Sequence, residues 1–270
     1  MVQRNSEYQN TADPLVPSKK LWIYTNFDCN LRCSYCVAES SPNSARRVVD
    51  LSTVKRIIDQ ANDLGNEHIY FTGGEPFILD DIFSMLAYSS ERLPTTVLTN
   101  AMLFNETRLK RLKGIHNENL TVQVSLDGCK PEQHDPYRGK GSWVKTIEGI
   151  RRLQENDFNV RISTTETTLN SDHLDEICDF CRSLGISADD HIIRPLAKRG
   201  FSDQGVEVSK QSLFPEMTIT ADGVFWHPLS TDPDLLISSE IFPLSNALSR
   251  LQVEFKEIIQ VGTKDLHEFQ

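Results

Sequence analysis

Apolar runs that predict strands alternate with helical patterns along most of this sequence. The six predicted strands cover residues 21–25, 68–72, 95–99, 120–126, 160–165 and 191–195. The helical patterns between them cover residues 52–65, 81–92, 106–112, 143–154 and 173–184, with Ser52 as the expected N-cap of the first. Strands separated by helices of this length form βαβ crossovers, which build a parallel sheet. A closed eight-fold barrel needs about 250 residues, so these units predict an open, partial (β/α)6 parallel barrel.

The alternation stops after Gly200. Residues 217–226 have the pattern of a β-hairpin, with Asp222-Gly223 at the turn. Residues 244–259 carry apolar side chains at helical spacing and predict a last helix. We therefore expect three parts in the chain. They are a flexible N-terminal tail at 1–19, the barrel at 20–200, and a C-terminal appendage of hairpin and helix at 201–270.

Charge and hydropathy argue against two classes of partner. The chain has 28 Lys and Arg against 38 Asp and Glu, a formal net charge of -10, whereas nucleic-acid-binding proteins cluster basic side chains. No apolar run approaches the roughly 20 residues of a membrane span. The polar start of the sequence also lacks the apolar core of a signal peptide. We expect a soluble cytoplasmic protein without nucleic-acid or membrane partners.

Three of the six cysteines, Cys29, Cys33 and Cys36, follow the first predicted strand directly. Without a secretory signal, a metal or redox role explains such a group better than disulfides do. A structural zinc site takes four protein ligands and no second cysteine knuckle follows, although a zinc-binding interaction domain stays an alternative. Three thiolates on one loop suit a [4Fe–4S] cluster, whose usual four ligands are cysteines. One iron would then lack a protein ligand and could serve as a docking site.

The spacing Cys-x3-Cys-x2-Cys after the first strand of a parallel barrel resembles that of the radical S-adenosylmethionine (SAM) enzymes. In that family SAM chelates the open iron through its amino and carboxylate groups. One electron from the reduced cluster, delivered by a donor such as flavodoxin or ferredoxin, cleaves SAM and yields a 5′-deoxyadenosyl radical that abstracts a substrate hydrogen atom. The resemblance covers about residues 20–200 and implies the same oxygen-sensitive cofactor, with Cys29, Cys33 and Cys36 as its ligands.

Further motifs of the family follow in order. Gly73-Gly74-Glu75-Pro76 after the second predicted strand is similar to the GGEP motif, which implies that Glu75 binds the SAM ammonium and that the glycines allow close approach to a ligand. The segments around Asn100 and Ser125 are similar to the TNG and SLDG motifs, respectively. Ala101 stands in place of the glycine of TNG. The resemblance implies these cofactor-binding residues: Tyr35, Gly73, Gly74, Glu75, Pro76, Asn100, Ser125, Asp127, Arg138 and Arg194.

The C-terminal hairpin and helix resemble the twitch part of the SPASM/twitch branch of the family. Members often have a cysteine shortly after the hairpin turn, and more beyond it, that hold auxiliary clusters. Here the corresponding segment ends in His227-Pro228, and no cysteine follows Cys181 in the sequence. The resemblance therefore implies a degenerate appendage without an auxiliary cluster. His227 is then an ordinary polar residue or, alternatively, a ligand or a substrate contact.

The three remaining cysteines carry weaker assignments. Cys178 and Cys181 are spaced i, i+3 on a predicted helix and share a face, which favours small core side chains over a metal or redox pair. Cys129 follows the SLDG-like motif, so it is a candidate for a thiol that returns a hydrogen atom to a substrate radical, with core packing as the alternative. Turn capping likewise stays an alternative for Asn100 and Ser125.

The missing auxiliary cysteines bear on the reaction. Without an auxiliary cluster as electron acceptor, redox-neutral chemistry such as epimerisation or rearrangement is favoured. About 19 polar residues precede the barrel, whereas peptide-modifying relatives often carry a leader-binding domain there. We therefore expect a radical SAM enzyme that acts on a small metabolite. The alternatives are a maturase of ribosomally made peptides and a non-catalytic iron–sulfur module, the second disfavoured by the intact Glu75 motif.

Overall fold

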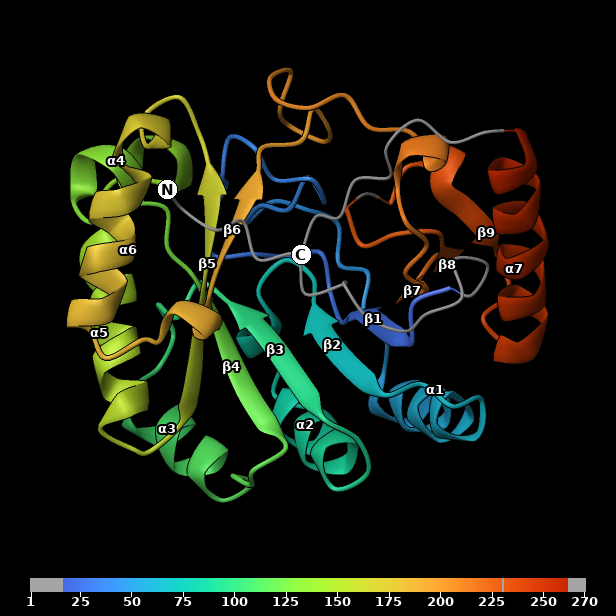
Figure 1. Cartoon of the computed structure of the whole chain (residues 1–270). Coiled ribbons are helices and arrows are strands. Elements are labelled where there is room, and N and C mark those ends of the chain that lie inside the picture. Colours follow the sequence, from blue (N-terminus) through green and yellow to red (C-terminus); the bar gives the residue numbers. More distant parts are fainter. Residues whose placement is uncertain (1–16, 230, 262–270) are drawn as a thin grey trace.

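Nine strands form one open sheet in the computed structural model, which describes residues 17–229 and 231–261 (Figure 1). Their order across the sheet is β6-β5-β4-β3-β2-β1-β7-β8-β9. The strands are β1 Lys20–Tyr24, β2 His68–Thr72, β3 Thr95–Thr99, β4 Leu120–Ser125, β5 Asn159–Glu166, β6 His191–Pro195, β7 Thr218–Thr220, β8 Gly223–Phe225 and β9 Leu236–Ser238. Residues 1–16 of the predicted tail lie outside the described residues.

The six strands from β1 to β6 all run parallel to their neighbours, as the alternating pattern predicts. β7 pairs in parallel with the free side of β1, and β8 and β9 add antiparallel strands beyond it. The sheet does not close on itself, because β6 and β9 stay at its two edges. The partial barrel is thus confirmed. Parallel strands bring their carboxyl ends to one edge of the sheet, so the loops after β1 to β6 meet there.

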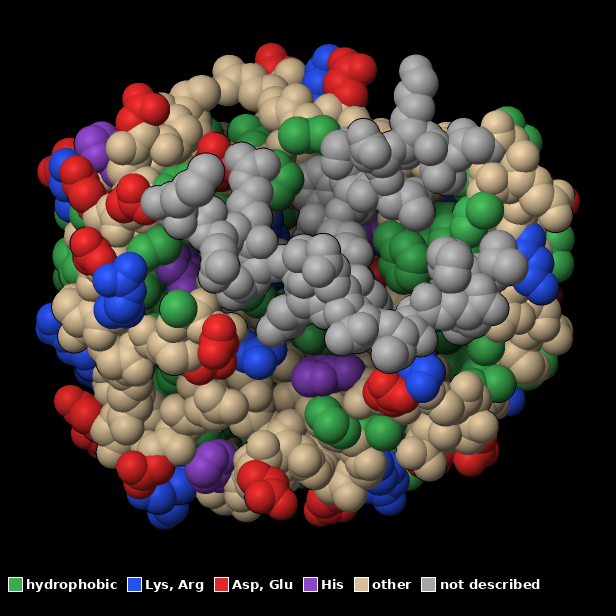
Figure 2. Space-filling model, in the orientation of Figure 1, with side chains coloured by type: hydrophobic (Ala, Val, Ile, Leu, Met, Phe, Trp, Pro, Cys, Tyr) green, Lys and Arg blue, Asp and Glu red, His purple; other side chains and the backbone are tan. Residues whose placement is uncertain are grey.

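Helices cover the convex face of this sheet (Figure 1). They are α1 Leu51–Asp63, α2 Ile82–Ser90, α3 Glu106–Lys113, α4 Pro131–Arg138, α5 Ser142–Gln154, α6 Leu174–Ser183 and α7 Leu244–Val261. Short 3-10 helices lie at Pro76–Ile78, Ser171–His173, Ala188–Asp190, Lys210–Ser212 and Pro233–Leu235. Of the helices in the described ranges, none is long and apolar enough to span a lipid bilayer. On the face that Figure 2 shows, acidic and basic side chains are interspersed over the described surface.

The side chains of β1 show how each strand serves two surfaces. Leu21 and Ile23 point toward the helices and join the main core with Ile57 of α1. Trp22 and Tyr24 alternate with them and line a pocket on the concave side of the sheet. This follows from the strand repeat, in which successive side chains point to opposite faces. The concave face therefore carries the aromatic and polar side chains of the barrel.

The helix α4 is missing from the sequence prediction. Pro131 stands in its first turn, where proline is well tolerated. Pro136 lies inside the helix, however, and an internal proline ordinarily predicts a break. The helix ends at Arg138, only two residues later. Its importance lies in this end, because α4 delivers the Arg138 side chain to the pocket.

Three smaller features also differ from the sequence prediction. Asp50, rather than Ser52, caps α1, and its Oδ1 accepts the backbone N–H of Thr53 at 3.0 Å. The strand β9 was not expected, because it is short and no hairpin turn marks it as Asp222-Gly223 marks β7 and β8. β7 continues the barrel sheet instead of starting a separate one, so the sheet runs across the expected boundary at residue 200. The division into 1–19, 20–200 and 201–270 stays a prediction.

Candidate active site

A pocket lies at the carboxyl ends of the parallel strands and gathers most of the residues assigned to cofactors. The loop after β1 brings the three cysteines, the loops after β2 and β3 bring polar groups, and β4, β6 and α4 complete the wall. The assigned residues that line it are Cys29, Cys33, Tyr35, Cys36, Gly73, Gly74, Glu75, Asn100, Ser125, Arg138 and Arg194. Pro76, Asp127 and Cys129 do not line it.

The cysteine loop is held in place by its own backbone. The N–H of Ser34 donates to the carbonyl of Tyr137 at 2.9 Å, which ties the loop to α4. Two of the sulfur atoms accept backbone N–H groups, Cys29 from Leu31 and Cys36 from Ser40, each at 3.4 Å. Hydrogen bonds to the sulfurs are one of the ways in which proteins tune an iron–sulfur cluster. The loop therefore presents thiols in the environment that such a cluster uses.

Burial leaves two of these thiols, those of Cys29 and Cys33, protonated in the chain alone. It raises the pKa of Cys29 to about 12 and that of Cys33 to about 11, and the neighbouring thiols raise both further. The Leu31 N–H acts in the other direction on Cys29, and the charge of Arg138 does so on Cys33. A bound metal deprotonates such thiols outright. A metal that binds in this pocket would therefore have to displace the protons of Cys29 and Cys33.

The donor set fits a cluster better than a single ion. Among the described residues, no three His, Cys, Asp or Glu side chains are gathered as ligands of one metal ion. A [4Fe–4S] cluster makes no such demand, because each thiolate binds a different iron. Cys29, Cys33 and Cys36 all lie on the loop after β1, and all three line the same pocket.

Glu75 is a buried carboxyl that faces this pocket with one acceptor position to spare. Its Oε1 accepts the Thr99 hydroxyl at 2.8 Å and the Phe77 N–H at 3.1 Å, and its Oε2 accepts the Asn100 N–H at 2.9 Å. A carboxylate has about four lone-pair positions, so one remains for a ligand. Burial outweighs the three bonds and raises the pKa of Glu75 to about 7. A cationic group in the pocket would hold the carboxylate ionised.

Gly73 and Gly74 are required by chain packing. A Cβ atom on Gly74 would lie 2.1 Å from the carbonyl oxygen of Asp28, and one on Gly73 would lie 2.5 Å from that of Asn26. Gly73 also has a φ of 145°, which favours glycine. The two glycines therefore let the loop after β2 press against the loop after β1. The GGEP-like motif predicted close approach of a ligand at these glycines, and the close approach that the structure shows is between these two loops.

Asp127 is one contact away from the pocket. Its side chain is fully buried. It accepts hydrogen bonds from Nε of Arg138 at 2.5 Å, from the N–H of Thr165 at 2.9 Å and from the hydroxyl of Tyr35. Arg138 lowers the pKa of this carboxyl despite its burial. Tyr35 and Arg138 do line the pocket, so Asp127 holds two lining residues in position. That SAM touches Asp127 itself stays a prediction.

The structure does not bring the remaining cysteines to the pocket. The N–H and the thiol of Cys129 both lie within hydrogen-bond distance of Gln133 Oε1, at 2.9 and 3.3 Å. Cys181 is buried in the main core, as expected, and Cys178 is partly buried on the same helix. Pro76 is buried in the short 3-10 helix that Glu75 caps. A hydrogen-donor role for Cys129 stays a prediction.

Several lining residues escaped the sequence analysis. They are Trp22, Tyr24, Thr72, Leu98, Thr99, Ser163, Thr165 and Leu229, and His227 was left with two readings. Trp22, Tyr24, Thr72, Leu98, Ser163 and Thr165 sit at alternate strand positions that face the concave side, so the two-residue repeat of each strand was the signal that could have found them. Thr99 is the exception, because it follows Leu98 directly at the end of β3. His227 and Leu229 follow β8, and only the pairing of β7 with β1 brings them here.

Comparison with known proteins finds relatives over the part of the chain that carries the three cysteines and Glu75. The family profile of the radical SAM superfamily matches residues 23–184. The AdoMet-dependent heme synthase of Methanosarcina barkeri is 28% identical over 183 residues, which are 67% of this chain and 51% of that protein. The antilisterial bacteriocin subtilosin biosynthesis protein AlbA of Bacillus subtilis is 32% identical over 162 residues, 59% of this chain and 36% of AlbA. The chain spans about half the length of the heme synthases that it matches.

A solved structure shows the same fold. Streptococcus suis SuiB bound to S-adenosylmethionine superimposes with a TM-score of 0.58 at 20% identity, over 94% of this chain and 50% of SuiB. The likeness extends beyond the profile match into the appendage, because it covers nearly the whole chain.

Proposed function

The chain belongs to the radical SAM superfamily, and we propose that it is an enzyme that abstracts a hydrogen atom from a small metabolite in a redox-neutral reaction. A [4Fe–4S] cluster and SAM are the cofactors of this family. When bound, they supply the electron and the carbon radical that remove the substrate hydrogen. The observation that supports the proposal is the single pocket that holds three loop thiols together with the Glu75 carboxylate.

In this proposal each polar group of the pocket has a task toward the cofactors. Cys29, Cys33 and Cys36 hold the cluster, and the backbone N–H groups on two sulfurs tune it. Glu75 accepts the ammonium of SAM through its spare lone pair. Arg138 takes an oxygen of the SAM carboxylate, because a guanidinium offers donors in a fixed fork.

Arg138 is prepared for this task by its surroundings. Its Nε is occupied by Asp127, and its guanidinium lies 5.4 Å from the ring centre of Tyr35. The ion pair keeps the guanidinium charged and oriented in a buried place, where an unpaired charge would be costly. Tyr35 and Ser125 line the pocket beside it and complete the proposed SAM contacts with Asn100.

The redox-neutral outcome rests on the cysteine pattern. No cysteine lies between Cys181 and Gln270, so the hairpin β7–β8 and the segment after it offer no thiol to an auxiliary electron-accepting cluster. Epimerisation or rearrangement needs no such acceptor. An electron donor such as flavodoxin or ferredoxin belongs to the proposal, since the cluster must be reduced for SAM to be cleaved.

A peptide substrate is the second candidate. The match to AlbA favours it, since that relative is a bacteriocin biosynthesis protein. The heme synthase matches favour a small molecule instead. The two candidates share the same cofactor chemistry and differ only in what enters the pocket.

Anaerobic reconstitution tests the proposal. The reconstituted chain should be brown, bind about four irons, and form 5′-deoxyadenosine from SAM when dithionite reduces it. Replacing Cys29, Cys33 and Cys36 together by Ala should abolish both the colour and the product. Cys178→Ala with Cys181→Ala is the matched control, because these cysteines lie outside the pocket and should leave both intact. A full cluster without 5′-deoxyadenosine would indicate a non-catalytic module, and an iron-free chain would contradict the cofactor assignment.

A further inference from the structure

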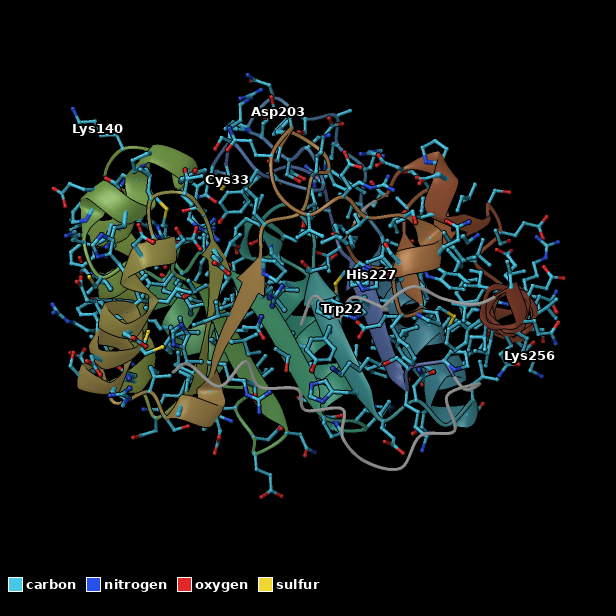
Figure 3. All side chains as sticks on the ribbon, turned by 45° about the horizontal axis from the view of Figure 1, so that its top comes forward. Trp22, Cys33, Lys140, Asp203, His227 and Lys256 are labelled. Carbon is cyan, nitrogen blue, oxygen red and sulfur yellow. The ribbon has the colours of Figure 1, made fainter. Side chains whose placement is uncertain are left out.

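A second group of side chains lines the pocket beside the proposed cofactor contacts. It consists of Trp22 of β1, Arg194 of β6 and His227, which follows β8. In Figure 3 the labelled Trp22 and His227 lie near each other at the middle of the sheet, while Cys33 lies apart from both. The three residues come from segments far apart in the sequence. The fold therefore brings these three side chains together around one pocket.

Arg194 brings an unsatisfied donor to this space. Its Nε is buried, and within the described residues it has no hydrogen-bond partner. Arg138 in the same pocket differs, because Asp127 occupies its Nε at 2.5 Å. Burial lowers the pKa of Arg194, but a guanidinium stays charged in proteins. A buried donor without a partner is costly, and an oxygen atom of a ligand would satisfy it.

His227 adds a second donor of fixed direction. Its Nδ1 accepts the N–H of Leu229 at 3.0 Å. Burial and the nearby charge of Arg194 lower the pKa of His227 to about 3, so the ring is neutral near pH 7. A neutral imidazole that accepts at Nδ1 carries its proton at Nε2. His227 lines the pocket, so this N–H is the ring donor that remains for a ligand.

Trp22 supplies a flat apolar surface. One side of its ring stacks on Tyr70 at 4.3 Å between centroids, and its Nε1 donates to Glu216 at 2.5 Å. The indole is therefore held rigidly where it lines the pocket. Its polar atom is already used, so what it offers a ligand is apolar contact.

We propose that Arg194, His227 and Trp22 form a subsite that binds the carboxylate of the substrate and packs the adjoining apolar part of it on the indole ring. Two donors face the space, which calls for a ligand rich in acceptors. One guanidinium and a neutral imidazole carry a single positive charge, which a monoanionic carboxylate matches. Glu216 adds a negative charge nearby that acts on Arg194 and disfavours a more highly charged anion such as a phosphate dianion.

SAM itself carries a carboxylate, so the carboxylate of SAM and that of the substrate must be assigned to different residues. We assign the SAM carboxylate to Arg138, which lies near Cys33. We assign the substrate carboxylate to Arg194, in place of the cofactor contact that the resemblance implied for it. The identity of the ligand as substrate rests on the proposed function. The binding of a carboxylate to the subsite is a property of the pocket alone and can be measured without turnover.

Titration of the SAM-loaded, reconstituted full chain with benzoate tests the subsite. Benzoate carries a carboxylate on a flat apolar ring, and benzamide is its neutral counterpart. We expect millimolar or tighter binding of benzoate, and weakening by about tenfold or more, the size of a charge-assisted hydrogen bond, for benzamide and for Arg194→Gln. Arg194→Lys keeps the charge but loses the forked donors, so its affinity for benzoate should lie between those of the wild type and Arg194→Gln.

Arg161→Gln is the matched control. Arg161 lies on the neighbouring strand β5, is only partly buried, pairs with Asp190 at 3.1 Å and does not line the pocket. Its variant should bind benzoate like the wild type. Thermal unfolding of all variants shows whether each is folded when it is titrated.

The outcomes separate the two carboxylate sources. Unchanged SAM affinity in Arg194→Gln together with lost benzoate binding supports the subsite. A loss of SAM affinity of about tenfold or more would place the SAM carboxylate on Arg194 and overturn it. No benzoate binding to the wild type, or equal binding of benzamide, would overturn it as well. Should the reduced chain form no 5′-deoxyadenosine, the proposed function fails, while the same titration still decides on the subsite.

Discussion

Arg138 donates from Nε to the Oδ2 of Asp127 at 2.5 Å, and both side chains are buried. Tyr35 donates its hydroxyl to the same carboxylate from the cysteine loop. One buried carboxylate therefore joins the end of β4 to α4 and to the loop between Cys33 and Cys36. The pair links the part of the chain that holds the thiols to the part that carries the proposed SAM contacts.

Replacing Asp127 by Asn should destabilise the chain strongly. The change leaves Arg138 as a buried charge without its partner, and breaking a buried pair in this way costs about 3–5 kcal/mol. Chemical denaturation of the chain measures the loss. Asp190→Asn is the control, because its partly exposed pair with Arg161 should contribute only about 0–1 kcal/mol. Equal losses in the two variants would contradict the role assigned to Asp127.

The strands of the barrel could be predicted from the sequence because each carries a short apolar run between helical patterns. The bounds of β2, β3 and β6 agree with the prediction, since Gly73 and Pro195 mark ends that the chain cannot easily extend. The helix α4 could not be predicted, because Pro136 argues locally against a helix.

The pocket was predictable in part for a similar reason. Cysteines and glycines at fixed spacing are visible in the sequence. His227 is recognised only once the sheet is assembled, because its place depends on the pairing of β7 with β1. Asp127 was expected to contact SAM. Its bond to Arg138 depends on α4, which the sequence did not predict, and its bond to Tyr35 depends on how the cysteine loop folds back.

Replacing Glu75 by Ala should weaken SAM binding without removing the cluster. A charge-assisted hydrogen bond to an ammonium is worth about 1.5–3 kcal/mol, which is roughly a 10- to 150-fold loss of affinity. Equilibrium binding of SAM to the reconstituted variant measures this, with iron content as the check on the cluster. Glu132→Ala is the control, because Glu132 is an exposed carboxylate on α4. Unchanged SAM affinity in Glu75→Ala would remove Glu75 from the site.

Glu75 should also leave a signature in the pH dependence of stability of the cofactor-free chain. Burial raises its pKa from 4.5 to about 7, so between these values the folded chain keeps a proton that the unfolded chain has lost. The contribution of Glu75 to the free energy of unfolding therefore falls as pH rises through this window and is constant above it. Buried histidines with lowered pKa values, such as His134 and His227, act in the opposite direction between about pH 6.5 and pH 4.

The difference between the wild type and Glu75→Gln isolates this contribution, since the histidines are common to both. We expect the stability of the variant relative to the wild type to rise by about 2–3 kcal/mol from pH 4.5 to pH 7.5. Denaturant titrations at a series of pH values measure it. Parallel pH curves for the two proteins would show that the pKa of Glu75 is not raised.

The last prediction concerns the contact between the two loops at Gly74. A Cβ atom here would lie 2.1 Å from the carbonyl oxygen of Asp28, so Gly74→Ala must push the loop after β2 away from the loop that carries Cys29. The atom it meets is backbone, which cannot turn aside as a flexible side chain can. We expect the variant to lose several kcal/mol of stability, as overpacking of about 1–3 kcal/mol is joined by the cost of unmade hydrogen bonds.

The hydrogen bonds at stake are those between the two loops. The N–H of Gly74 donates to the carbonyl of Asn26 at 2.8 Å, and the N–H of Glu75 donates to that of Asp28 at 3.0 Å. Reconstituted Gly74→Ala should therefore bind less iron and less SAM at once, because one shift moves both Cys29 and Glu75. Gly114→Ala is the matched control, since its Cβ would come no closer than 3.3 Å to another atom. A Gly74→Ala protein with wild-type iron content, SAM affinity and stability would show that the loops are not packed this tightly.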